Sequence, residues 1–307
     1  MKSFLQEVSL GLSKKNKKLS SKWFYDFHGS KLFEQITKLE EYYPTRTERK
    51  ILKDNKIEIA NKIGKNAILI EPGAGDIKKI AIFLSSLDKP KKYIPLDISE
   101  NYITKISQGF KKKFPKVAIT PKGYDFSGNK KLPFKINLSE NIIIFFPGST
   151  IGNFEKKDAV KFLKMLKSKF KAKKIIIGAD LVKDIPTLIS AYDDKKGVTA
   201  KFNKNILQRI NTELGGDINL NSYKHLAIYN KSKKRIEMRL KSKKNNNIKI
   251  NGSKYLIKKN EEIHTENSHK YTIKSFKNIA NEAGWKIKKT WVDDKKLFSV
   301  HCLDLAL

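Results

Sequence analysis

The chain has 307 residues and a formal net charge of +34, from 65 lysines and arginines against 31 aspartates and glutamates. With 39% hydrophobic residues it can bury a large core, while no apolar run reaches the roughly 18 residues of a membrane-spanning helix and the N-terminus lacks the features of a signal peptide. The single cysteine, Cys302, excludes an intramolecular disulfide and a cysteine-based metal cluster, so we expect a cytoplasmic protein that holds no metal and contacts no membrane.

Two aromatic clusters lie near the start of the chain, at residues 22–30 and 41–48, on either side of a helix predicted over 31–39. For most of these rings, packing on the core is the simpler interpretation. Tyr42 and Tyr43, however, stand side by side before a proline, and neighbouring side chains of an extended segment point in opposite directions. We therefore expect one of the two tyrosines to line a pocket.

A helix predicted over 49–63 leads to a buried strand over 67–70, which ends in Glu71 and is followed by Gly73 and a second glycine ahead of the next helix. Glycines let the backbone approach a ligand closely, and an acid such as Asp97, at the end of the next strand, can accept both hydroxyls of a ribose. The third glycine of the dinucleotide fingerprint is missing. Glu71 would repel a pyrophosphate but suits a cationic ligand such as the amino group of S-adenosylmethionine (SAM). A tight strand-to-helix turn without a ligand is the alternative.

A third strand is predicted over 117–120, and Asp125 and Phe126 follow it. A carboxylate next to an aromatic ring can hold an adenine, although an ordinary loop acid beside a core ring is the simpler interpretation. A fourth strand, over 142–146, runs into a loop of small polar residues at 147–154. Ligands of parallel α/β sheets bind at such carboxyl ends, so this loop is a candidate ligand contact.

Strands and helices alternate through a fifth strand at 174–177, which predicts a doubly wound parallel sheet. The alternation then stops, and we interpret residues 186–269 as an insertion that forms a second unit. Its predicted elements are helices over 186–191 and 199–214, strands over 225–230, 235–242 and 247–250, a hairpin turn at 245–247, and a polar segment over 261–268. A helix over 271–283 and two strands, over 287–291 and 297–305, close the chain with an antiparallel pair typical of class I SAM-dependent methyltransferases.

Motifs spread from Tyr25 to His301 resemble those of the histidine Nα-methyltransferases of the ergothioneine pathway. They lie at residues 25–30 (Tyr-Asp-Phe-His-Gly-Ser), 41–46 (Glu-Tyr-Tyr-Pro-Thr-Arg), 148–154 (Gly-Ser-Thr-Ile-Gly-Asn-Phe), 191–200, 211–215, 235–238 (Arg-Ile-Glu-Met) and 263–268 (Ile-His-Thr-Glu-Asn-Ser). The resemblance implies a Rossmann-like α/β class I methyltransferase fold, with a seven-stranded sheet and a smaller α+β substrate-binding domain. The SAM-binding domain is expected at 46–185 and 271–307, and the substrate-binding domain at 1–45 and 186–270.

The resemblance also implies the site residues. The cofactor SAM is expected on Glu71, Gly73, Lys79, Asp97, Asp125, Phe126 and Gly148. The substrate L-histidine is expected on Tyr42, Asn153, Tyr192, Met238, Glu266 and Ser268, with Tyr25 near the amine as the candidate catalytic proton acceptor. Members of the family commonly have serine and threonine near Ile77 and Ile80, and their absence here removes the basis for a hydroxyl contact in that turn.

By the same resemblance, Asn153 and Tyr192 hold the substrate carboxylate, and Glu266 and Ser268 hold the imidazole. An imidazole offers one donor and one acceptor, and a carboxylate plus a hydroxyl answers both. The implied reaction is an in-line methyl transfer to the α-amine, repeated three times to give hercynine. Orientation of the reactants should supply most of the acceleration.

Three alternatives stay open. The first is a methyltransferase of another small amine or aromatic amino acid, against which Glu266 and Met238 argue. The second, motivated by the charge of +34, is an RNA methyltransferase. Its positive charge is nearly all lysine and is spread over the whole length, whereas proteins that read bases use arginine forks as well, so we expect no nucleic-acid partner. The third is a catalytically silent SAM-binding regulator, which the full set of substrate residues argues against. We expect the protein to be a monomer.

Overall fold

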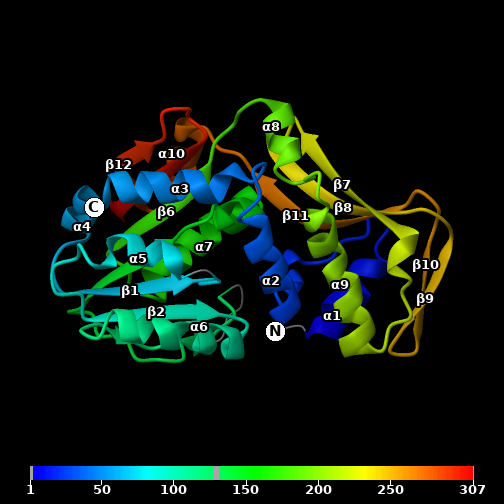
Figure 1. Ribbon diagram of the computed structural model, residues 1–307, viewed down its shortest axis with the longest axis horizontal. Coiled ribbons are helices and arrows are strands. Elements are labelled where there is room, and N and C mark those ends of the chain that lie inside the picture. The colour runs from blue at the N-terminus through cyan, green and yellow to red at the C-terminus, as the bar shows by residue number, and fades with distance from the viewer. Residues whose placement is uncertain (1–2, 76, 127–130, 307) are drawn as a thin grey trace. The chain divides into compact units, whose positions relative to one another are not determined.

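The computed structural model describes residues 3–75, 77–126 and 131–306 (Figure 1). The chain divides into two compact units. Unit 1 comprises Met1–Tyr43 and Lys183–Ser268, and unit 2 comprises Pro44–Val182 and His269–Leu307. Within the described ranges, no helix has both the length and the apolar character needed to cross a bilayer.

Unit 2 is built on a mostly parallel sheet whose strands follow the order β12-β13-β6-β5-β1-β2-β3. These strands are β1 (Ala67–Pro72), β2 (Lys92–Asp97), β3 (Ala118–Ile119), β5 (Asn141–Phe146), β6 (Lys174–Asp180), β12 (Trp285–Val292) and β13 (Phe298–Leu305), and the short β4 (Lys122–Gly123) pairs with β2. β1 runs parallel to β2 and β5, and β5 to β6, whereas β13 is antiparallel to both β6 and β12. A parallel sheet closed by this antiparallel pair confirms the predicted class I methyltransferase fold.

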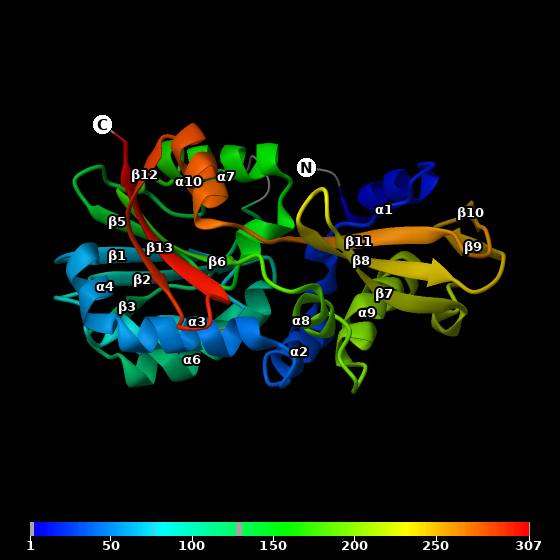
Figure 2. The same ribbon diagram turned by 90° about the horizontal axis from the view of Figure 1, so that it is seen from above.

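Helices cover both faces of this sheet. They are α3 (Tyr43–Asp54), α4 (Lys56–Ile63), α5 (Lys78–Leu84), α6 (Glu100–Lys113), η2 (Thr150–Asn153), α7 (Lys156–Ser168) and α10 (Ile273–Glu282). Figure 2 shows α7 and α10 on one side of the sheet and α3 and α6 on the other. Ile68 and Ile70 of β1 pack in the cluster with α7 and α10, while Leu69 between them packs in the cluster with α3 to α6. Because both faces are buried, the strands are continuous apolar runs.

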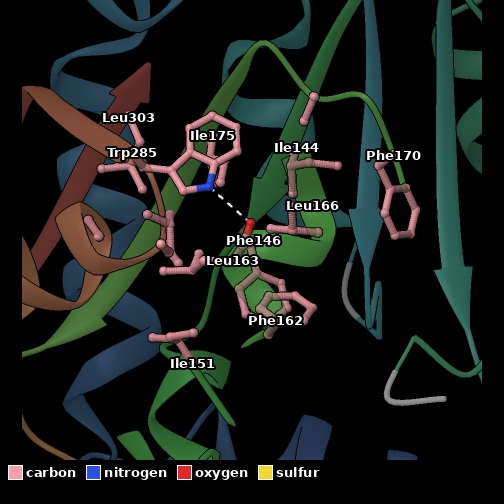
Figure 3. Packing of buried hydrophobic residues seen from close by; sticks show 14 of the residues in the cluster. Ile144, Phe146, Ile151, Phe162, Leu163, Leu166, Phe170, Ile175, Trp285 and Leu303 are labelled. Atoms are coloured by element: carbon pink, nitrogen blue, oxygen red, sulfur yellow. Dashed lines mark hydrogen bonds between the residues drawn. The ribbon is translucent and has the colours of Figure 1, made fainter. Parts of the chain in front are cut away.

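The cluster beneath α7 and α10 is closed by the indole of Trp285, which is fully buried (Figure 3). Its Nε1 donates a hydrogen bond of 2.9 Å to the carbonyl oxygen of Leu163, so the polar atom of the largest core side chain is satisfied. This bond ties the start of β12 to α7, at the edge of the sheet where β6 begins.

Unit 1 combines a three-stranded sheet in the order β11-β8-β7 with a hairpin and several helices. Its elements are α1 (Phe4–Ser13), η1 (Ser21–Phe24), α2 (Phe27–Ile36), α8 (Ile185–Ser190), α9 (Val198–Leu214), η3 (Leu220–Ser222), β7 (Tyr223–Asn230), β8 (Arg235–Ser242), β9 (Asn246–Ile250), β10 (Ser253–Ile257) and β11 (Glu262–His269). α9 packs against α2 and β7, and its buried face carries polar residues as well as apolar ones.

Two predictions about the N-terminal half are wrong in detail. The single helix expected over 49–63 is two helices, α3 and α4, separated at Asn55. The side chain of Asn55 donates to the carbonyl oxygen of Ile51 at 2.8 Å, which competes with helical backbone pairing. Tyr43 already belongs to α3, so the premise that Tyr42 and Tyr43 lie on an extended segment is wrong. Both tyrosines are buried, and the expected pocket lining by one of them stays a prediction.

One further prediction fails in the second half of unit 1, and one strand there was not predicted. The expected hairpin turn at 245–247 lies partly within β9, and the chain reverses instead at Asn251 and Gly252, whose φ angles of 46° and 79° suit these two residue types. The polar segment over 261–268 forms the strand β11, most of which is buried. Its polarity hid the strand because its inward side chains make hydrogen bonds instead of apolar contacts.

Candidate functional site

The carboxyl end of β1 forms a tight turn that faces the end of β2. Glu71 is buried and accepts a hydrogen bond from the hydroxyl of Tyr93 on β2. Gly73 has a φ of 72°, and its backbone N–H donates to the carbonyl oxygen of Leu96 at 2.7 Å. A Cβ atom at Gly73 would lie 3.3 Å from the ring of Phe126, so glycine lets the backbone approach that ring. Among the predicted cofactor residues, Gly73 and Phe126 are thus neighbours.

Asp97 ends β2 beside this turn. Burial raises the pKa of its carboxyl to about 6, against the opposing hydrogen bonds from the backbone amides of Ser99 and Ile98. The Ser99 amide donates to Asp97 Oδ1 at 2.8 Å. The Asp97 carbonyl oxygen accepts from the amide of Tyr124 at 2.8 Å, which brings the Asp125 segment to the same strand end. A partly buried carboxylate whose hydrogen bonds, among the described residues, come from backbone amides fits a ligand that donates two hydroxyls, as a ribose does.

Lys79 and Gly148 meet at an acid that the sequence did not reveal. Glu48, on α3, is 1% exposed, and its Oε2 lies 2.7 Å from the Nζ of Lys79. Both carboxylate oxygens lie 2.9 Å from the backbone nitrogen of Gly148, whose φ is 80°. The sequence could have predicted the burial of Glu48 from its spacing, because Ile51 and Leu52 follow it by three and four residues and place it on the apolar face of α3.

The loop after β5 is held by its own polar contacts. Ser149 adopts a left-handed conformation with a φ of 57°, and its Oγ accepts a hydrogen bond of 2.9 Å from the amide of Asp180 at the end of β6. The carboxylate of Asp180 in turn pairs with Lys270 at 2.7 Å, with both side chains buried. Asn153 is the last residue of η2 in this loop. The loop that carries it is therefore fixed to β6 by Ser149.

Three predicted substrate residues form a buried group in unit 1. The Tyr192 hydroxyl and the Ser268 Oγ lie 2.7 Å apart, which joins the end of α8 to β11. The rings of Tyr42 and Tyr192 meet edge to face, with centroids 6.1 Å apart. Tyr25 is connected to this group through the ring of Phe33, whose centroid lies 5.7 Å from that of Tyr25 and 6.2 Å from that of Tyr42.

Polar residues of α9 fix the backbone on either side of Tyr25. The Nδ2 of Asn205 donates to the carbonyl oxygen of Phe24 at 3.1 Å and to the carboxylate of Asp26 at 2.9 Å. Arg209 donates to the carbonyl oxygen of Trp23 at 2.9 Å. Such side chains satisfy carbonyl groups that the irregular segment cannot pair itself. Tyr25 is thereby presented from a rigid stretch of chain.

A second buried network ties Tyr192 to β7, β8 and β11. The Nε2 of His225 contacts the carbonyl oxygen of Tyr192 at 2.8 Å, and its Nδ1 contacts the Nδ2 of Asn203 at 2.8 Å. Burial lowers the pKa of His225, so the ring is neutral and donates to Tyr192 while it accepts from Asn203. The Thr265 hydroxyl lies 2.6 Å from Asn203 Oδ1 and 3.0 Å from the carbonyl oxygen of Met238, so one proton is shared between two acceptors.

This network reaches the remaining predicted substrate residues through the backbone. Met238 is 1% exposed on β8, and Glu266, next to Thr265 on β11, is buried as well. The carbonyl oxygen of Glu266 contacts the Nε2 of His264 at 3.0 Å. Asn153 and all predicted cofactor residues belong to unit 2, and the other predicted substrate residues belong to unit 1.

Comparison with known proteins gives a consistent result. The profile of a family described as "Histidine-specific methyltransferase, SAM-dependent" matches residues 4–305 of this chain. The "Histidine N-alpha-methyltransferase" of Mycolicibacterium smegmatis is 34% identical over 295 residues, covering 94% of this chain and 90% of that protein. The protein of the same name from Mycobacterium tuberculosis is 32% identical over 295 residues, covering 94% and 91%. The "Ergothioneine biosynthesis protein 1" of Neurospora crassa is 36% identical over 196 residues, covering 62% of this chain and 22% of that protein.

Proposed function

Because this chain belongs to the family of SAM-dependent, histidine-specific methyltransferases, we propose that it transfers three methyl groups from SAM to the α-amine of L-histidine, giving hercynine for ergothioneine biosynthesis. The observation that carries the proposal is the hydrogen bond between Tyr192 and Ser268. These residues are 76 positions apart, and one is predicted to hold the substrate carboxylate and the other its imidazole. Residues that bind the two ends of one small molecule must lie close together, as Tyr192 and Ser268 do.

The cofactor residues are assigned by the chemistry of their side chains. Asp97 is proposed to accept the ribose hydroxyls, and Asp125 with Phe126 to hold the adenine. Glu71, Gly73, Lys79 and Gly148 are proposed to surround the methionine end. When bound there, SAM supplies an electrophilic methyl group on its sulfonium sulfur. The left-handed turns at Gly73 and Gly148, and the raised pKa of Asp97, support this assignment.

The substrate residues are assigned by complementarity to histidine. Glu266 accepts from one imidazole nitrogen and Ser268 donates to the other, so the pair reads the ring as a donor and an acceptor. Asn153 and Tyr192 hold the carboxylate, with Tyr42 and Met238 closing the apolar sides. The burial of Tyr192, Glu266 and Ser268 supports this proposal, because hydrogen bonds discriminate most strongly where an unmatched polar group cannot return to water.

The amine has to be neutral to accept a methyl group. A dry pocket lowers the pKa of an amine, and Tyr25 is proposed to take its proton directly or through water. The segment that carries Tyr25 is fixed by Asn205 and Arg209, so the hydroxyl can keep its place over three successive transfers. Transfer stops at three methyl groups because the product amine has no lone pair.

The proposal is tested by incubating the protein with isotope-labelled SAM and all twenty amino acids, with products read by mass spectrometry. Histidine should gain three methyl groups and the other amino acids none. Tyr192→Phe should raise KM for histidine by roughly fivefold or more, the effect of one lost hydrogen bond. Tyr255→Phe, in the hairpin β9–β10, is the matched control and should change nothing. Methylation of tryptophan or phenylalanine in preference to histidine would refute the substrate assignment.

We also propose that the protein acts as a monomer in the cytoplasm, without a nucleic-acid or membrane partner. The scarcity of arginine supports the absence of a nucleic-acid partner, because the positive charge is nearly all lysine and proteins that read bases use arginine forks as well. RNA binding should therefore be weak at physiological salt, as measured by filter binding across a salt series. Stoichiometric methylation of a cellular RNA would refute the amino-acid substrate.

A further inference from the structure

We propose that Glu48 is a positioning residue for the methionine end of SAM, acting through Lys79 and Gly148. The inference rests on the proposed cofactor and adds to it a buried acid whose contacts include two predicted cofactor residues. Glu48 comes from α3, Lys79 from α5 and Gly148 from the end of β5. One carboxylate thus joins three segments of unit 2 at the edge of the sheet where ligands of this fold class bind.

The absence of a side chain at Gly178 of β6 leaves space for the Glu48 carboxylate against the sheet. A Cβ atom at Gly178 of β6 would lie 2.1 Å from Glu48 Oε1 and 3.0 Å from the ring of Phe298. Any side chain at position 178 would therefore push Glu48 out of its place. The glycine does not serve a turn here, because it lies within a regular strand. Its role in the structure is to admit the acid.

Stability alone does not account for the pair of Glu48 and Lys79. The side chains are 1% and 9% exposed, so both charges have lost most of their hydration. Replacing a buried ion pair by apolar side chains is often neutral or stabilising, whereas removing one partner is strongly destabilising. Because the buried pair adds little net stability, a ligand-binding role for the remaining N–H donors of Lys79 explains it better.

The ammonium of Lys79 has three donors, and within the described contacts one of them goes to Glu48. A Cβ atom at Gly148 would lie 3.3 Å from the same Nζ, so the ammonium sits against that glycine. A free amino-acid end carries a carboxylate, for which a fixed ammonium is the complementary partner. The Glu48 carboxylate holds that ammonium in place across a distance of 2.7 Å. Glu48 also fixes the backbone of Gly148 by accepting its N–H.

The test compares two ligands that share a nucleoside thioether and differ in the amino-acid end. S-adenosylhomocysteine carries that end, and 5′-methylthioadenosine does not. In Glu48→Gln, titration calorimetry should show affinity for S-adenosylhomocysteine weakened roughly tenfold, the effect of losing one charge-assisted hydrogen bond. Affinity for 5′-methylthioadenosine should stay within about twofold. Glu282→Gln removes an acid from an exposed ion pair with Lys156 and should leave both affinities unchanged.

Two further variants separate positioning from general support of the fold. If Glu48 acts through Lys79, the double variant Glu48→Gln/Lys79→Met should bind S-adenosylhomocysteine no more weakly than Lys79→Met alone. Gly178→Ala keeps every charge but displaces the carboxylate, so it should reproduce the selective loss of Glu48→Gln. Retained binding of 5′-methylthioadenosine reports that each variant is folded around its nucleoside site.

The outcomes are distinguishable. An equal loss for both ligands in Glu48→Gln would mean that Glu48 only supports the fold, and an unchanged or tighter affinity for S-adenosylhomocysteine would mean that it does not position Lys79. Either result overturns the inference and leaves the proposed function in place. Failure of the wild-type protein to bind either ligand would refute the proposed cofactor, and the inference with it.

Discussion

Asp97 gives the sharpest test of the cofactor site, because its environment is unfavourable to its charge when no ligand is bound. Burial raises the pKa of its carboxyl from 3.8 to about 6, and the compensating hydrogen bonds come from the backbone amides of Ser99 and Ile98. Ionised Asp97 therefore destabilises the ligand-free protein at neutral pH. Asp97→Asn keeps the size and shape of the side chain and removes the charge.

The magnitude follows from the pKa difference between the folded and unfolded states. Because the folded pKa is the higher one, the folded protein binds more protons than the unfolded chain, and the free energy of unfolding falls as the pH rises from about 4 to about 6. A shift from 3.8 to about 6 sets an upper limit of about 3 kcal/mol. We expect Asp97→Asn to stabilise the ligand-free protein by about 1–3 kcal/mol at pH 7 and by little at pH 4.

The same variant should lose cofactor affinity. An amide cannot accept both ribose hydroxyls as a carboxylate does, so SAM binding should weaken by about 1–3 kcal/mol. In the wild-type protein, SAM affinity should fall roughly tenfold from pH 8 to pH 5, because only the ionised fraction of Asp97 binds the hydroxyls. A variant that is more stable but binds SAM more weakly shows that the replaced side chain serves binding at a cost in stability.

Urea denaturation without ligand at pH 4, 5 and 7 measures the first effect, and titration calorimetry with SAM from pH 5 to pH 8 measures the second. Asp88→Asn, an exposed acid paired with Lys65 in the same unit, is the control and should change neither profile. If Asp97→Asn shows the wild-type pH dependence of unfolding together with unchanged SAM affinity, the carboxylate is not the ribose acceptor.

Three other predictions address unit 1. Glu266→Ala should weaken histidine recognition by about 1–3 kcal/mol and relax discrimination against tryptophan, and unaltered histidine kinetics would contradict the assignment. Asn203→Leu removes the donor to His225 and the acceptor of Thr265, so the free energy of unfolding in urea should fall by about 2–4 kcal/mol, and an unchanged value would show the network to be dispensable. Despite burial, hydrogen bonds from Arg239, Arg235 and Asn230 lower the pKa of Glu237 from 4.5 to about 2. Its stabilising contribution is present above pH 4.5 and lost towards pH 2, so the stability deficit of Glu237→Gln in acid titrations should shrink over that range.

The sheet of unit 2 was predictable because its strands are apolar runs that end at glycines and acids. Burial on both faces forces continuous apolar strands such as β1 and β5, and glycines after β1 mark the turn. Asp97 could be predicted as a site residue from its place at the end of β2, but its raised pKa depends on three-dimensional burial and cannot be read from the sequence. Position along a strand is a local property, whereas the environment of a side chain is not.

Glu48 and β11 were missed for a common physical reason. An acid on a helix or a run of polar residues is ordinarily exposed, because burying polar groups costs free energy unless specific partners pair with them. The partners of Glu48 come from α5 and β5, and Thr265 of β11 meets Asn203 of α9. His225 begins the strand predicted over 225–230, and its contacts with Tyr192 and Asn203 depend on the tertiary fold. Long-range polar pairing is the part of this structure that periodicity cannot reveal.

Under the proposed cofactor assignment, Asp97 and Glu48 of unit 2 contribute to cofactor binding in different ways. The described contacts of Asp97 are hydrogen bonds from backbone amides, and we propose that its charge is stabilised chiefly when the ribose of SAM donates hydrogen bonds. Glu48 is already paired with Lys79 at 2.7 Å, so its charge is compensated before a ligand arrives. Loss of Asp97 should therefore alter the pH dependence of SAM affinity. Loss of Glu48 should instead reduce the contribution of the amino-acid end of SAM to its affinity. A charge pair that is already compensated can orient a ligand without destabilising the ligand-free protein.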